Sequence, residues 1–129
     1  VHRHVGEMEK EIEIWGGAQK IIFAPHLVPL TRGMLSTIYI QLNKAKKHVL
    51  EVLQSAYENE PFVRVLTDGI PHIKMAQNSN FCFIGAQEVA ETNQVILFSV
   101  IDNLGKGAST QAVQNMNVML GFDETTALL

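Results

Sequence analysis

Cysteine and charge are both scarce in this sequence. Its 129 residues include one cysteine, Cys82, which cannot form a disulfide within the chain. We therefore expect a reducing compartment, the cytoplasm or, in a eukaryote, an organelle matrix. Only 18% of the residues are charged, against about 25% in a typical soluble domain. This shortage indicates that part of the surface meets a partner or another domain.

An excess of basic residues and a long apolar run are also missing. The net charge of −3 offers no broad attraction for a phosphate backbone, so we expect no nucleic-acid partner. The longest apolar stretches, 21–30 and 95–101, are too short to span a bilayer, so we expect no membrane partner. No leader segment is recognisable, but the chain opens on Val1 rather than Met, which leaves its natural start open.

The apolar fraction of 47% is sufficient for one folded domain. Helical periodicity predicts helices between Gly6 and Gly16 and over 44–59 and 109–120. Strands are predicted over 20–23, 34–42, 62–66, 81–89 and 94–101, the last two as a hairpin.

The alternating positions of 34–42 predict a strand with both faces at least partly covered. Residues 105–107 are predicted to form a flexible turn. The order of elements indicates an α+β fold, a largely antiparallel sheet with helices packed on one face.

The first residues carry two histidines and a carboxylate, His2, His4 and Glu7. Three interpretations stay open. His4 can act as an acid or base oriented by Glu7, the two histidines can ligate a metal with a third ligand from elsewhere, or the segment is a solvated terminus.

Two further segments are candidate anion sites. His26 lies in a proline-stiffened loop that leads to Arg32, whose guanidinium suits carboxylate or phosphate, although surface loops also have this composition. The segment 102–111 leaves a strand, passes two glycines and Lys106 and opens a helix, where backbone N–H groups can hold an anion. Capping by Ser109 explains part of this pattern without a ligand. Cys82, between two phenylalanines, is expected to be a buried apolar residue rather than a nucleophile.

Four motifs, in order along the chain, resemble the C-terminal part of the N-acetyl-gamma-glutamyl-phosphate reductase family. They are His-Arg-His-Val-Gly-Glu (2–7), Phe-Ala-Pro-His-Leu-Val-Pro-Leu-Thr-Arg-Gly (23–33), Glu-Pro-Phe-Val-Arg-Val (60–65) and Asp-Asn-Leu-Gly-Lys-Gly-Ala-Ser-Thr-Gln-Ala-Val-Gln-Asn-Met-Asn (102–117). The resemblance implies a C-terminal domain like that of glyceraldehyde-phosphate dehydrogenase. Residues 1–129 would be a substrate-binding and oligomerisation domain, and 105–129 would pack toward an N-terminal dinucleotide-binding domain that this chain lacks.

The resemblance implies NADPH-dependent reduction of N-acetylglutamyl 5-phosphate to the 5-semialdehyde in arginine biosynthesis. A cysteine outside this chain attacks the acyl phosphate, and Cys82 does not lie in that motif. A histidine, His4 with His2 second, serves as acid and base. Substrate contacts are expected from Arg32, His26 and Glu7.

Cofactor contacts in this family-based assignment are expected from Asn103, Lys106 and Gly107. The NADPH would be bound mainly by the absent domain, and the isolated chain is expected to be inactive.

The sequence departs from the family pattern at two positions, and three alternatives remain. Gly6 stands where the family has proline, and Thr110 stands where it has glycine. The alternatives are a reductase for the aminoadipyl homologue, a stand-alone α+β binding or oligomerisation module, and a histidine-based metal protein. We also expect self-association, to a dimer or tetramer, because the low charge fraction leaves apolar surface that needs cover.

Overall fold

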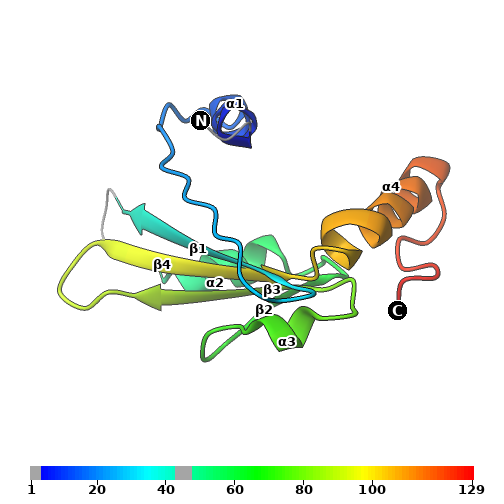
Figure 1. Cartoon of the computed structure of the whole chain (residues 1–129). Coiled ribbons are helices and arrows are strands. Elements are labelled where there is room, and N and C mark those ends of the chain that lie inside the picture. Colours follow the sequence, from blue (N-terminus) through cyan, green and yellow to red (C-terminus); the bar gives the residue numbers. More distant parts are fainter. Residues whose placement is uncertain (1–3, 43–47) are drawn as a thin grey trace.

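The computed structural model describes residues 4–42 and 48–129. In chain order the elements are α1 (His4–Ile14), β1 (Met34–Gln41), α2 (Val49–Ala56), β2 (Val63–Val65), α3 (Ile73–Ala76), β3 (Cys82–Glu88), β4 (Gln94–Ile101), the π-helical turn η1 (Gly105–Ser109) and α4 (Thr110–Leu120) (Figure 1). The predicted α+β class is thereby confirmed.

The four strands form one sheet in the order β1-β4-β3-β2. β4 pairs antiparallel with both β1 and β3, and β3 and β4 form the predicted hairpin. β2 pairs parallel with β3 through the short helix α3, a crossover that the sequence patterns did not predict. The sheet is therefore largely antiparallel, as expected, with one parallel pair at its edge.

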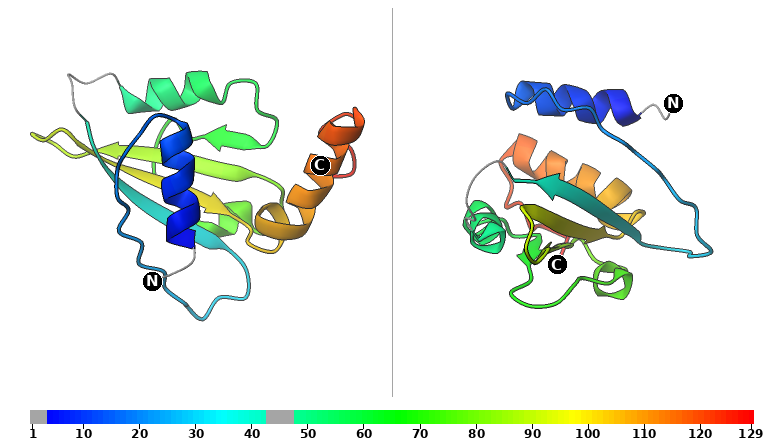
Figure 2. Two further views of the ribbon diagram at one scale, coloured as in Figure 1. Left: turned by 90° about the horizontal axis from the view of Figure 1, so that it is seen from above. Right: turned by 90° about the vertical axis from the view of Figure 1, so that its left-hand side faces the viewer.

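The helices do not all cover the sheet. Figure 2 shows α2 and α3 on one side of it, while α1 stands apart on the other side and α4 extends from one end. The buried apolar residues come from the sheet and the covered side: Phe62, Ala76, Val95 and Val100. Neither α1 nor α2 has a fully buried residue. The prediction of helices on one face thus holds for α2 and α3 but not for α1.

Three local predictions are wrong. No strand forms over 20–23, because the segment has no strand beside it and Ile22 is 98% exposed. Residues 105–107 form part of η1 rather than a flexible turn. Ser109 makes no capping bond; its hydroxyl donates to the Leu104 carbonyl at 2.9 Å. Part of the predicted helix 44–59 lies outside the described residues, and α2 covers the rest of its apolar stripe.

β1 is less covered than its sequence predicted. Six of its eight residues are exposed, and Tyr39 retains 79% of its accessible surface. The strand also lies at the edge of the sheet, with β4 as its one neighbour. Met34, Leu35 and Ile38 also remain about half exposed, so this strand carries apolar surface that the described residues leave open.

Gly33 has little room for a side chain. Its φ is +116°, and an added Cβ would lie 2.0 Å from the Cγ2 atom of Ile73. We expect Gly33→Ala to lower the free energy of unfolding in urea by about 3 kcal/mol. Gly69→Ala is the matched control, since its φ is +78° and no atom lies within 4 Å, so only backbone strain of about 1 kcal/mol applies. Equal losses in the two variants would contradict the predicted clash.

Candidate functional site

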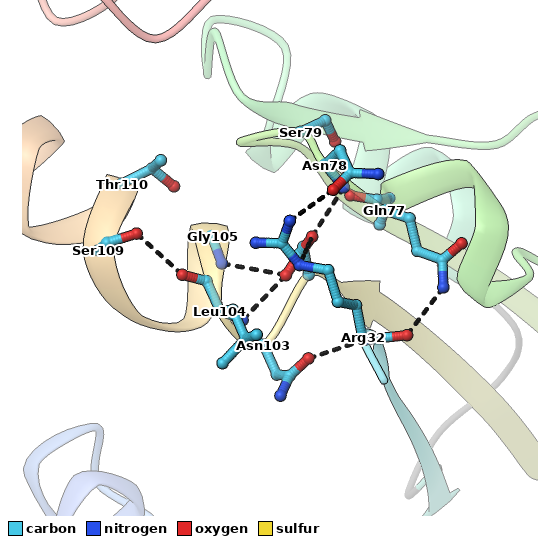
Figure 3. A network of polar contacts seen from close by, with 12 residues as sticks. Arg32, Gln77, Asn78, Ser79, Asn103, Leu104, Gly105, Ser109 and Thr110 are labelled. Atoms are coloured by element: carbon cyan, nitrogen blue, oxygen red, sulfur yellow. Dashed lines mark hydrogen bonds and ion pairs between the residues drawn. The ribbon is translucent and has the colours of Figure 1, made fainter. Parts of the chain in front are cut away.

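Asp102 joins three segments that are far apart in the sequence, and its partners Arg32, Asn78, Leu104 and Gly105 lie close together in Figure 3. Its side chain is fully buried at the end of β4. One carboxylate oxygen, Oδ1, accepts the N–H groups of Leu104 and Gly105 at 2.9 and 3.0 Å. The other, Oδ2, accepts the N–H of Asn78 at 2.7 Å. The local sequence explains the first two bonds, because an aspartate that ends a strand commonly turns the chain in this way.

The Oδ2 atom of Asp102 also faces Arg32, which lies two residues before β1. The Nε atom of Arg32 lies 3.2 Å from it and is buried without a regular hydrogen bond, so the contact is an ion pair. The Nη1 atom donates to the Asn78 side chain at 2.5 Å. The remaining terminal nitrogen, Nη2, makes no hydrogen bond within the described residues, and the side chain is 36% exposed.

Backbone contacts complete this arrangement, which we call the Arg32 clasp and define by Arg32, Gly33, Asn78, Asp102 and Asn103. The Gly33 N–H donates to the Asn103 side chain at 2.7 Å. From just outside the clasp, the side chain of Gln77 donates to the Arg32 carbonyl at 2.8 Å. Arg32 is therefore held by both its backbone and its guanidinium.

The clasp keeps Asp102 charged. Burial alone would raise the pKa of this carboxyl, but the three N–H donors and the Arg32 charge outweigh burial and leave the pKa below its ordinary value. An ionised carboxylate with three N–H donors and one ion pair is a strong anchor, because each of these contacts involves its charge.

A second polar group, which we call the tail cluster, lies beside the clasp and consists of Asn80, Lys106, Thr110, Gln114 and Glu124. The side-chain oxygen of Gln114 accepts from Lys106 at 2.5 Å and from Asn80 at 3.1 Å, and its side-chain NH₂ donates to Glu124 at 2.5 Å. The Thr110 hydroxyl donates to the side-chain oxygen of Asn80 at 2.6 Å. Thr110, which departs from the family pattern, thus supplies the donor for a buried amide.

Lys106 points into the protein rather than outward. Its ammonium lies 5.4 Å from the centre of the Phe62 ring, in addition to its bond to Gln114. Burial lowers its pKa below the ordinary lysine value, although the nearby Cys82, Glu124 and Glu60 act in the opposite direction. The bond to Gln114 uses one of the three N–H donors of this ammonium.

The predicted site residues fall into separate groups. Arg32 and Asn103 meet in the clasp, whereas Lys106 belongs to the tail cluster. His4 and Glu7 begin α1, and His2 lies outside the described residues.

His26 and Gly107 lie apart from these side-chain groups. His26 is exposed in the extended segment before β1, where its Nδ1 lies 2.9 Å from the Ala24 carbonyl. Gly107 lies in η1, and its N–H donates to the Asp102 carbonyl at 2.8 Å.

The sequence did not indicate Asn78 as a site residue, and it did not indicate that Asp102 lies at the centre of the clasp. Asn78 has a φ of +59°, a conformation that asparagine tolerates better than most residues, but no periodic pattern indicated that it meets Arg32. The order Asp102-Asn103-Leu104-Gly105 was a readable turn signal. Arg32 and Asp102 lie at the same end of the neighbouring strands β1 and β4, and no local pattern in the sequence indicated their contact.

Two features are absent from the residues that the structure describes. In the ranges 4–42 and 48–129, no group of three histidine, cysteine, aspartate or glutamate side chains is arranged to hold a metal ion. No helix in the same ranges is long and apolar enough to cross a membrane. The proposed His2–His4 metal pair is untested, because His2 lies outside the described residues.

The chain belongs to the semialdehyde dehydrogenase dimerisation-domain family, whose sequence profile matches residues 1–103. It is similar to proteins named N-acetyl-gamma-glutamyl-phosphate reductase. The relative from Thermoanaerobacter pseudethanolicus is 50% identical over 98% of this chain. Relatives from Geobacter metallireducens and Methanocaldococcus jannaschii are 49% and 44% identical over 99% and 98% of it. The chain spans 38% of the length of each of these relatives.

The fold is also found in solved structures. Aspartate semialdehyde dehydrogenase II from Vibrio cholerae, in a crystal structure described as complexed with ASA, superposes with a TM-score of 0.56. The match covers 73% of this chain and 29% of that one at 19% identity. It therefore supports the α+β fold and carries no argument about ligands.

The depressed pKa of Asp102 makes stability depend on pH. Because the folded-state pKa lies below the unfolded value of about 3.9, the stability that this carboxylate contributes is present above that value and is lost as the pH falls through the folded pKa. We expect Asp102→Asn to lower the free energy of unfolding at pH 7 by about 2 to 4 kcal/mol. The difference from the unmodified chain should shrink below about pH 4.

Urea denaturation at a series of pH values measures this difference. The control is Asp68→Asn, an exposed turn carboxyl, which should change stability by less than about 0.5 kcal/mol. A deficit in Asp102→Asn that stays constant down to pH 3 would show that the carboxylate charge is not what holds the clasp.

Proposed function

We propose that this chain is the substrate-binding and oligomerisation part of an NADPH-dependent reductase that converts N-acetylglutamyl 5-phosphate to the 5-semialdehyde. The supporting observation is 50% identity over 98% of the chain to a protein of that name. We also propose the cytoplasm, or an organelle matrix in a eukaryote, as its compartment, in keeping with its single free cysteine.

The proposed substrate is an anion, and the chain carries a net charge of −3. Binding therefore requires a local positive group that remains partly accessible. Arg32 meets this requirement, because Nη2 is left over after its ion pair with Asp102 and its bond to Asn78. We assign Arg32 to a substrate carboxylate or phosphate oxygen, with His26 and Glu7 as secondary contacts.

His4 is our candidate for moving the proton. It begins α1, with the Glu7 carboxylate one helical turn further on. A histidine changes charge near neutral pH, so it can take a proton from an attacking thiol and return one to an oxygen that becomes negatively charged. His2 is the second candidate for this role.

Asn103 is the residue of this chain that best fits a contact to a nicotinamide cofactor. Its carbonyl oxygen is used by the Gly33 N–H, which leaves the amide NH₂ as a donor that can bind a carboxamide oxygen. When bound, NADPH supplies the hydride. Lys106 and Gly107 would act indirectly, by holding the chain that carries Asn103.

The remaining exposed apolar surfaces fit the proposed larger assembly. On α4 and just after it, Val118, Met119, Leu120 and Phe122 are exposed. We assign 105–129 to contact with an N-terminal dinucleotide-binding domain. We assign the uncovered β1 to contact with a second copy of the chain, in keeping with a dimerisation-domain family.

The proposed proton transfer is tested in the complete gene product that contains this chain. We expect it to reduce NADP⁺ with N-acetylglutamate 5-semialdehyde in a phosphate-dependent manner, and we expect His4→Asn to lower kcat about 100-fold or more. The control is His72→Asn, an exposed histidine that directly precedes α3, which should leave kcat unchanged. Full activity in His4→Asn would move the role to His2.

The same assay separates the alternatives. Activity with the aminoadipyl semialdehyde and none with the N-acetylglutamyl one would indicate the homologous reductase. No activity with either substrate, from a folded protein, would indicate a non-catalytic binding module. Turnover by the isolated chain would contradict the proposal that it lacks the nucleophile and the dinucleotide-binding domain.

Self-association through β1 has its own test. We expect the chain to be a dimer or larger at tens of micromolar, and Tyr39→Glu to weaken association about tenfold or more, because it would bury an unpaired charge in the interface. Sedimentation equilibrium measures the change. Thr67→Glu, on an exposed turn, is the control and should associate normally. A monomer before any substitution would contradict the assignment.

A further inference from the structure

We propose that Asp102 is the positioning residue of the anion site, a role that rests on the function proposed above. Its carboxylate holds the Arg32 guanidinium in place, and Nη2, which makes no hydrogen bond within the described residues, is left to bind the substrate anion. The assignment goes beyond the predicted site, in which Asp102 had no role and Arg32 was an unsupported surface residue.

The carboxylate of Asp102 is held in one orientation. Both of its oxygens accept backbone N–H groups, two from the turn into η1 and one from Asn78. These donors belong to the main chain, and Gly105 packs so closely that an added Cβ would lie 3.1 Å from the Ser79 carbonyl. The position of the charge is therefore set by the fold itself.

The fixed charge of Asp102 orients the Arg32 side chain. An arginine side chain is long and flexible, and an exposed one samples many rotamers. Here Nε is buried against Oδ2 of Asp102, and Nη1 is bonded to Asn78. Two sides of the planar guanidinium are thus engaged, and the direction of its third side follows from its planarity.

An Arg32 side chain that is already ordered favours binding of the substrate anion. A cationic side chain that is already fixed loses little conformational entropy when an anion binds. Less of the binding free energy is therefore spent on ordering the side chain. Without Asp102 the charge of Arg32 would persist but its position would not. Loss of Asp102 should therefore raise KM for the anionic substrate and change kcat much less.

Variants of the complete gene product test this directly. Asp102→Asn keeps one acceptor oxygen but replaces Oδ2 with an NH₂ group that opposes the Arg32 and Asn78 donors. We expect it to raise KM for the semialdehyde or for phosphate about tenfold. Because Asp102→Asn can also impair folding, Asn78→Gly provides a milder variant. It removes the Nη1 acceptor, keeps the N–H bond to Asp102 and suits the positive φ of this position.

The double variant separates positioning from a purely structural role. If Asp102 acts through Arg32, then Arg32→Lys with Asp102→Asn should raise KM no more than Arg32→Lys does alone. The matched control is Gln77→Ala, which removes the bond to the Arg32 carbonyl but leaves the guanidinium held. It should leave KM within about twofold. If the double variant raised KM by the product of the two single-variant increases, the proposal would be overturned.

A second readout does not depend on activity. The chain has three arginines, so nuclear magnetic resonance can follow the Arg32 Nε–H signal, identified by its loss in Arg32→Lys. We expect this proton to exchange slowly in the unmodified chain and in Gln77→Ala, and rapidly in Asp102→Asn. N-acetyl-L-glutamate, added as the probe anion, should perturb the signal before but not after Asp102→Asn.

These two readouts keep the outcomes distinct. An inactive gene product in which the probe still perturbs the Arg32 signal would refute the proposed reductase and support the anion site. An unchanged Nε–H signal in Asp102→Asn would overturn the positioning role whatever the activity. A lost signal with unchanged KM for both substrates would also overturn it, because Arg32 would then be ordered for structure alone.

Discussion

The buried charge of Asp102 is the constraint on which the rest of this structure depends. It lies where β4 ends, and it ties the start of β1 and the loop after α3 to the turn that leads into η1 and α4. A buried carboxylate without partners is strongly unfavourable, so these segments have to meet if the chain is to fold. The partners that the Asp102 charge requires are available only when these three segments come together in the folded chain.

The result is a domain whose polar contacts gather at one end and whose other surfaces expose apolar side chains. The polar side chains of the clasp and of the tail cluster are joined by hydrogen bonds and an ion pair, whereas β1, α1 and the outer side of α4 expose apolar side chains. Such surfaces are unusual on a protein that works alone. They fit a family defined by dimerisation and relatives more than twice as long as this chain. The proposed active site accordingly draws on groups from outside it.

Local patterns in the sequence predicted most of the strands and helices but not the contacts between them. Strand alternation located β1, β3 and β4 to within about a residue, and the helix predicted over 109–120 ends at Gly121, whose φ is +73°. The strand at 20–23 failed because β-propensity requires a neighbouring strand, and the described chain offers none. Resemblance supplied the family, but it did not indicate that Lys106 points inward.

The candidate site shows the same limit more sharply. Arg32 was recognised as a cation before a glycine, which is local information. Its partners Asn78 and Asp102 are 46 and 70 residues away along the chain, and no periodic pattern links them. The role of Thr110 was equally hidden, because its acceptor, the buried side chain of Asn80, becomes visible only in the fold.

Hydrogen exchange of single amides tests the central claim most directly. If Asp102 holds the three segments together, the N–H groups of Asn78, Leu104 and Gly105 should exchange only through global unfolding, all with the same protection. Exchange of Asn78 through local opening, with Leu104 and Gly105 still protected, would contradict the account. The clasp would then be a surface contact rather than the point on which the fold depends.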